Sequence, residues 1–180
     1  MFIQTETTPN PNSLKFLPGK NVSTGGSFEV TKKEDTDNEL VRNIMSINGV
    51  TGIFLGADFL SINKKEDVVW EDIKHIVISL INDFYATGKA FVIANELFEE
   101  KKEEYNEIEK KIISILETKI RPAVAKDGGD IKFKEFKDGV VKVELQGSCS
   151  GCPSSTMTLK QGVQNLLCHY LPEVKEVVAI

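Results

Sequence analysis

Residues 147–155 read Gly-Ser-Cys-Ser-Gly-Cys-Pro-Ser-Ser and carry two thiols, Cys149 and Cys152, three positions apart. An alternating apolar run precedes this stretch and an amphipathic run follows it, which predicts a strand, a short turn and a helix. Pro153 is favoured in the first turn of a helix, so the thiols lie at or just before a helix N-terminus. Free N–H groups and the helix dipole favour a thiolate there. Glycines beside the thiols and serines near them leave no apolar pocket, so we expect reactive cysteines and not buried, inert ones.

The second half of the chain builds a small domain around this stretch. Its predicted elements are a helix over 108–124, strands over 131–136 and 141–145, a helix over 159–170 and a strand over 174–180. Pro122 predicts a kink or a tightened final turn in the first helix. Asp-Gly-Gly-Asp at 127–130 is expected to stop that helix, and it could also shape the loop that faces the cysteines. Asp138-Gly139 predicts a tight hairpin turn.

The first half predicts a second small domain. Its elements are strands over 2–6 and 14–17, a loop over 21–38 that could carry a strand, a helix through Met45, a hairpin over 50–62 and a helix from Trp70 to Gly88. Asp37 or Asn38 can cap the first helix. In the second helix six apolar residues recur at helical spacing and form one face.

A dense run of Glu and Lys at 96–104 separates the two halves and is typical of a solvated linker. The apolar patch before it, Ala90–Ala94, would either dock on the first domain or contact a partner. The fold class predicted is α+β, with two small α+β domains joined by a charged linker. The predicted bounds are 1–88 for the first domain, 89–105 for the linker and 106–180 for the second domain.

Composition excludes several classes of protein. The 180 residues are 41% hydrophobic, with a net charge of −5, which suffices for a core but offers no basic face to nucleic acid. The longest apolar runs fall far short of the roughly 20 residues that span a membrane, and the N-terminus shows no signal or transit pattern. Three cysteines, an odd number, argue against a secreted disulfide framework and for a reducing compartment.

A closed zinc site is one possible use of the two thiols, and it needs four Cys or His ligands. Cys168 lies sixteen positions beyond Cys152 on the predicted helix, which is about 24 Å at 1.5 Å per residue. We therefore expect Cys168 to be a small buried side chain near the helix end. His75 and His169 are expected to be surface residues, so the pair of thiols lacks nearby partners in its own chain.

Two other uses remain open at this point. A thiol–disulfide oxidoreductase carries a CxxC at a strand-to-helix junction, although it would require a larger fold with further strands. A [4Fe–4S] cluster takes four thiolates, which two chains could supply with one CxxC each across a twofold axis. Apart from the CxxC, the sequence contains no catalytic motif of the GxxxxGK[ST], HExxH, GxSxG or GxGxxG type.

Several stretches resemble a known family. Residues 121–131 and 147–159 look like the C-terminal domain of NifU-like proteins. Stretches of the first half resemble the N-terminal domain of Nfu-type iron–sulfur carriers. They are Thr5–Phe16, Gly49-Val50, Phe54–Phe59 and Trp70. Together the resemblance covers nearly the whole chain.

The resemblance implies an iron–sulfur carrier whose ligands are Cys149 and Cys152, and we therefore predict a protein that is not an enzyme. Such a carrier binds a [4Fe–4S] cluster between two protomers of a homodimer, with [2Fe–2S] as an alternative form. It receives the cluster from an upstream donor and hands it to apo-proteins, without nucleic acid or membrane partners. Eukaryotic members are mitochondrial. Because the family's N-terminal domain starts almost at Met1 here, we predict a bacterial cytoplasm, with the mitochondrial matrix as the alternative for a mature eukaryotic form.

Overall fold

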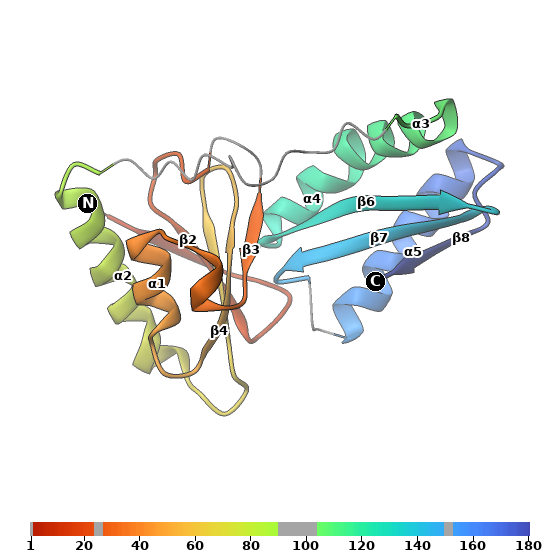
Figure 1. Ribbon diagram of the computed structural model, residues 1–180. Helices are drawn as coiled ribbons and strands as arrows, with labels where there is room; N and C mark the ends of the chain where they lie inside the picture. Colours follow the sequence, from red (N-terminus) through yellow and green to blue (C-terminus); the bar gives the residue numbers. More distant parts are fainter. Residues whose placement is uncertain (1, 24–26, 90–103, 150–152) are drawn as a thin grey trace.

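The computed structural model describes residues 2–23, 27–89, 104–149 and 153–180, and they form two α+β units (Figure 1). Each unit has its own hydrophobic core. This confirms the predicted fold class. The apolar patch at 90–94 and most of the predicted linker lie outside the described residues, so the exact domain bounds stay a prediction. Among the described helices, none is both long and apolar enough to cross a membrane.

The first unit is a five-stranded antiparallel sheet in the order β1-β2-β5-β4-β3. Its strands are β1 (Gln4–Thr7), β2 (Ser13–Leu17), β3 (Phe28–Val30), β4 (Val50–Leu55) and β5 (Leu60–Lys64). The predicted strands are therefore confirmed, and the loop before the first helix does carry a strand, β3. A short 3-10 turn, η1 (Lys33–Asp35), precedes that helix.

Helices α1 (Glu39–Met45) and α2 (Trp70–Ala86) cover one face of this sheet. Asn38 caps α1, because its side chain accepts a hydrogen bond from the Val41 N–H at 3.1 Å. Ile73, Val77 and Ile81 of α2 are buried against the sheet, as their spacing predicts. Figure 1 shows both helices on one side of the sheet and the second unit on the other.

The second unit is a three-stranded sheet backed by helices. Its elements are α3 (Glu107–Ile115), a π-helical turn η2 (Leu116–Ile120), α4 (Arg121–Lys126), β6 (Gly129–Lys137), β7 (Val140–Gly147), α5 (Pro153–Tyr170) and β8 (Glu176–Ala179). Strand β7 is central, antiparallel to β6 and parallel to β8, which α5 makes possible as the crossover. The predicted tight turn is confirmed: Asp138 and Gly139 both have positive φ, 52° and 79°, as a type I′ turn requires.

Pro122 widens the helix that contains it, so the prediction of a tightened final turn is wrong. The N–H of Arg121 bonds to the Leu116 carbonyl, five residues back, and the helix continues to Lys126. Proline has no N–H, and its ring crowds the carbonyl four residues earlier. A wider turn relieves that crowding and keeps the remaining carbonyls paired.

Candidate cysteine site

Cys149 lies two residues after the end of β7 and four residues before the start of α5. Only 7% of Cys149 is exposed, and it packs with the core of the second unit. Its Sγ stands 2.9 Å from where a Cβ on Gly129 would be, so the sulfur rests directly on the backbone of β6. The expectation that no apolar pocket surrounds the thiols is therefore wrong for Cys149. Cys152 lies outside the described residues.

Hydrogen bonds to backbone atoms hold the turn that carries Cys149. Thr156, in the first turn of α5, donates from its hydroxyl to the Cys149 carbonyl at 3.1 Å. The Ser148 N–H donates to the Gly128 carbonyl at 3.3 Å, and the Ser148 hydroxyl donates to the Asp127 carbonyl. Hydrogen bonds thus join the cysteine turn to the 127–130 turn. This agrees with the expectation that Asp-Gly-Gly-Asp could shape the loop that faces the cysteines.

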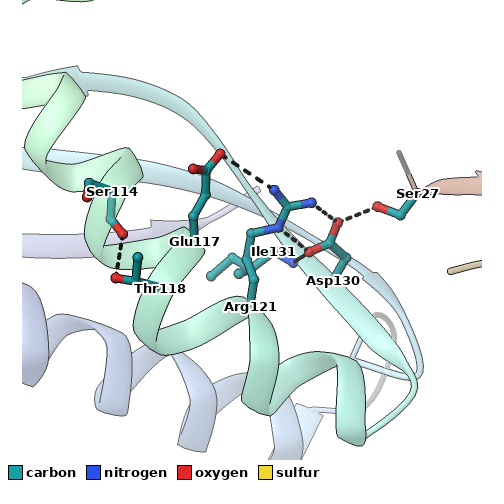
Figure 2. Close-up of polar contacts among 7 residues, drawn as sticks. All are labelled: Ser27, Ser114, Glu117, Thr118, Arg121, Asp130 and Ile131. Carbon is teal, nitrogen blue, oxygen red and sulfur yellow. Dashed lines mark hydrogen bonds and ion pairs between the residues drawn. The ribbon is translucent and has the colours of Figure 1, made fainter. Parts of the chain in front are cut away.

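Asp130 is a buried carboxylate that binds partners from both units (Figure 2). Arg121 donates two hydrogen bonds of 2.9 Å each to the Asp130 carboxylate, one from Nε and one from an Nη. The Ile131 N–H donates to it at 2.8 Å, and the Ser27 hydroxyl of the first unit also donates to it. Glu117 forms a second ion pair with the guanidinium, 3.8 Å from its other end, on the solvent side. A buried carboxylate needs this degree of pairing.

Lys132 lies beside this pair and also reaches the first unit, where its Nζ donates to the Ser27 carbonyl at 3.0 Å. Burial lowers the pKa of the Lys132 ammonium, and the neighbouring Asp130 carboxylate acts in the opposite direction. Both charged residues at the start of β6 therefore serve the junction between the two units.

The other candidate ligands lie away from the cysteine turn. Cys168 is half-buried near the far end of α5, where its thiol donates to the Val174 carbonyl at 3.2 Å. His75 and His169 are exposed, as predicted. In the part of the chain that the structure describes, no three His, Cys, Asp or Glu side chains gather in a way that could hold a metal ion.

Residues of the first unit also contact the cysteine turn, and the sequence did not indicate them. Asn10 donates from Nδ2 to the Ser148 carbonyl at 3.2 Å, and Asn63 donates to the Gly147 carbonyl at 3.4 Å. Glu29 accepts a hydrogen bond from the Gly147 N–H at 3.2 Å. These contacts join residues more than eighty positions apart, which no local pattern encodes. Polar residues alternate with the core residues of β2 and β5, which is the pattern of a sheet with one solvated face, so local patterning pointed away from these contacts.

Fold and site define a class: a two-unit α+β protein with a cysteine pair between a strand and a helix. Residues 3–88 match the family described as "Scaffold protein Nfu/NifU N terminal", and residues 112–178 match the "NifU-like domain". The chain belongs to the Nfu/NifU family.

Relatives in several organisms extend over nearly the whole chain. NifU-like protein 4, mitochondrial, of Arabidopsis thaliana is 43% identical over 98% of this chain and 65% of its own length. The NFU1 iron-sulfur cluster scaffold homolog, mitochondrial, of Homo sapiens is 44% identical over 98% of this chain and 71% of its own length. The chain thus spans about two thirds of the length of these relatives. A solution structure of a NifU-like protein from Saccharomyces cerevisiae covers 53% of this chain and 86% of its own, with 29% identity and a TM-score of 0.46.

Proposed function

We propose that this chain is an iron–sulfur cluster carrier. In this proposal Cys149 and Cys152 of one protomer and the same pair of a second protomer bind a [4Fe–4S] cluster, which is then passed to apo-proteins. The cluster is cargo, and the chain performs no catalytic turnover. The support from relatives is that the human relative is named an iron-sulfur cluster scaffold homolog and spans both units of this chain.

One structural observation carries the proposal: α5 runs unbroken from Pro153 to Tyr170. Cys168 is therefore fifteen residues of helix beyond Pro153, about 22 Å at the helical rise, and Cys152 immediately precedes Pro153 in the sequence. Iron–sulfur clusters are held by cysteine thiolates, and a [4Fe–4S] cluster takes four of them. A chain that offers two thiols at one place therefore supplies half of such a site, and a second copy of the chain is the simplest source of the other half.

Reconstitution with iron and sulfide under anaerobic conditions tests the proposal. We expect about four irons and four sulfides per pair of chains and a change from monomer to dimer mass, as the four-thiolate requirement implies. Iron binding with no change in mass would contradict the shared site. Failure to bind iron, together with rapid reduction of a protein disulfide, would instead support the CxxC oxidoreductase.

Cysteine variants locate the ligands. Cys149→Ser and Cys152→Ser should each abolish cluster binding, while Cys168→Ala, the matched control, should bind a full cluster. Cys168 packs against the core of the second unit near the far end of α5 and donates a hydrogen bond to the Val174 carbonyl. Loss of the cluster in Cys168→Ala, with the circular dichroism spectrum unchanged, would show that the ligand set is wrong.

The names of the relatives also bear on location. Both the plant and the human relative are named mitochondrial, which supports the mitochondrial matrix for this chain over the bacterial cytoplasm. Partners in this proposal are a cluster donor and apo-proteins that receive the cluster.

A further inference from the structure

One row of side chains crosses four strands of the first sheet on the face away from α1 and α2. Lys15 of β2 pairs in register with Ser61 of β5, Ser61 with Phe54 of β4, and Phe54 with Glu29 of β3. Within the row Lys15 is 8%, Ser61 0% and Phe54 1% exposed. The helices cover the opposite face, so the second unit, together with Phe59 of the first, buries this row (Figure 1).

Three members of the row meet one of two glycine turns beside the cysteine, and the fourth, Lys15, meets the last turn of α4 just before the first glycine turn. Lys15 donates from Nζ to the carbonyl of Ala125, just before the first turn, at 3.2 Å. The Ser61 hydroxyl lies 2.6 Å from where a Cβ on Gly128 would be, and the Phe54 ring lies 3.0 Å from the corresponding point on Gly147. Glu29 accepts the hydrogen bond from the Gly147 N–H.

The two glycines make this approach possible. Gly128 and Gly147 have φ of 81° and 70°, a region that other residues avoid. They also leave no side chain between the sheet and the turn backbone, where Ser61 and Phe54 already stand. The face of the first sheet is thus complementary in shape to the two turns.

The polar atoms of this contact are incompletely paired. Within the described residues, four side-chain atoms near it are buried without a hydrogen-bond partner: Ser13 Oγ, Ser61 Oγ, Asn63 Oδ1 and Gln146 Oε1. Water would hydrogen-bond to each of them once the units separate. Unpaired buried polar groups oppose burial, so they weaken the docking.

Docking also restrains Cys149 itself. The carbonyls of Gly147 and Ser148, which immediately precede this cysteine, both accept hydrogen bonds from the first unit. Cys149 is buried in this state, so its sulfur can reach iron only if the turn moves. A turn held at Gly147 and Ser148 cannot move without breaking those hydrogen bonds.

We propose that the outer face of the first sheet is a reversible docking surface for the chain's own cysteine turn, and that docking competes with pairing of two chains around a cluster. The competition rests on the proposed carrier function, whereas the docking itself does not. In the docked chain the first unit holds the backbone of Gly147 and Ser148, and undocking frees the turn to move Cys149 out of the second unit's core towards iron and a second copy.

Ser61→Arg tests the docking surface. Arginine at position 61 blocks the approach of Gly128 but points into water once the units separate. Ser79→Arg, the same substitution at an exposed position of α2, is the matched control. Both are made in a Cys152→Ser, Cys168→Ala background, in which Cys149 is the one remaining cysteine, and the rate of Cys149 alkylation is measured without iron. Protection of the β4 and β5 amides from hydrogen exchange shows that the first unit stays folded.

In the cluster-free chain, we expect Ser61→Arg to raise the alkylation rate and the exchange rate of the Gly147 amide. If the units are docked in about nine tenths of the chains, the undocked fraction rises from about one tenth to nearly all when docking is lost. Both rates should therefore rise about tenfold. Ser79→Arg should leave both rates unchanged. Equal rates in Ser61→Arg and the control, with the β4 and β5 amides protected, would overturn the docking surface.

The same substitution in the chain with all three cysteines tests the competition. Ser61→Arg should then form the cluster-bridged dimer at a lower protein concentration than Ser79→Arg. Faster alkylation without this gain would overturn the competition and keep the docking surface. If no variant binds iron, and neither does the unsubstituted chain, the carrier function fails while the alkylation result still decides the docking.

Discussion

Gly129→Ala should destabilise the second unit and displace the cysteine sulfur. A Cβ at this position would stand 2.5 Å from the Gln146 carbonyl oxygen and 2.9 Å from Cys149 Sγ. Both distances are shorter than carbon tolerates. The carbonyl belongs to β7, which pairs with β6 along its length, so it has little freedom to retreat. The sulfur, at the start of the turn, is the group expected to move.

The magnitude follows from comparing two glycines of the same unit. Overpacking a filled site costs about 1–3 kcal/mol. Gly162, inside α5, has no atom within 4 Å of its Cβ position, so Gly162→Ala should stabilise the helix by about 0.5–1 kcal/mol. The two Gly→Ala variants should therefore differ in unfolding free energy by about 1.5–4 kcal/mol.

Native-state hydrogen exchange of the β6 and β7 amides measures the unfolding free energy of this unit by itself. Reconstitution with iron and sulfide then reports on the sulfur: Gly129→Ala should bind less cluster than Gly162→Ala at equal folded fraction. Gly129→Ala with unchanged exchange rates and a full cluster would refute the assignment of this contact. It would show that the turn accommodates a methyl group at a position where the structure leaves no space for one.

Three further substitutions test the other contacts. Asp130→Asn should lower the unfolding free energy by about 1–3 kcal/mol, because it removes the negative charge that pairs with Arg121. The Arg121 guanidinium is partly solvated, which limits the cost. Asn106→Ala should cost about 1 kcal/mol, since its side chain caps α3 in a capping box. Lys89→Met should raise the pKa of Glu39 towards its ordinary value, because a hydrogen bond and charge attraction from Lys89 now lower it. The stabilisation from that pair is present above the ordinary carboxyl pKa and is lost as the pH falls through the lowered one; an NMR titration of the Glu39 carboxyl measures the change.

Each substitution has a control in the same chain. Glu144→Gln breaks a more exposed ion pair with Lys134 and should cost no more than about 1 kcal/mol in the same unfolding experiment. Val69→Ala, at an N-cap without a side-chain hydrogen bond, should cost no capping energy when α2 unfolding is followed by circular dichroism. The pKa of Glu135, which Lys142 lowers, should not change in Lys89→Met. If Asp130→Asn lowers the unfolding free energy no more than Glu144→Gln does, the role given to the Arg121–Asp130 pair is wrong. If the pKa of Glu39 does not change in Lys89→Met, the role given to Lys89 is wrong.

Local patterns in the sequence predicted most of the elements because each depends on neighbouring residues. The Asp138-Gly139 turn needs two residues that accept positive φ, and the structure has both. Asn38 caps α1 because its side chain reaches a backbone N–H three residues on. Pro153 begins α5 as its missing N–H allows. The resemblance to the Nfu/NifU family rested on the same short motifs and is confirmed.

Local patterns did not predict the surroundings of Cys149. Glycines and serines around a thiol suggested an open site, yet glycine removes bulk and so allows strand β6 to lie against the sulfur. The same reasoning applies to Pro122, where the sequence indicates a disturbance but not whether the turn tightens or widens. In both cases the outcome depends on which atoms pack nearby, and those atoms come from other elements.

By itself, the sequence determined two α+β units, a strand-turn-helix that carries the cysteine pair, and membership of a family. These features follow from hydrophobic periodicity and from the conformations that glycine, proline and asparagine permit. Tertiary structure alone decided that Cys149 is buried and which residues face the two glycine turns and the end of α4 beside it: Lys15, Ser61, Phe54 and Glu29. Strand pairing places those four residues in one row, although they are up to 46 positions apart in the chain. Contact between that row and the glycine turns requires two surfaces to match in shape, which is a property of the folded units and not of any single segment.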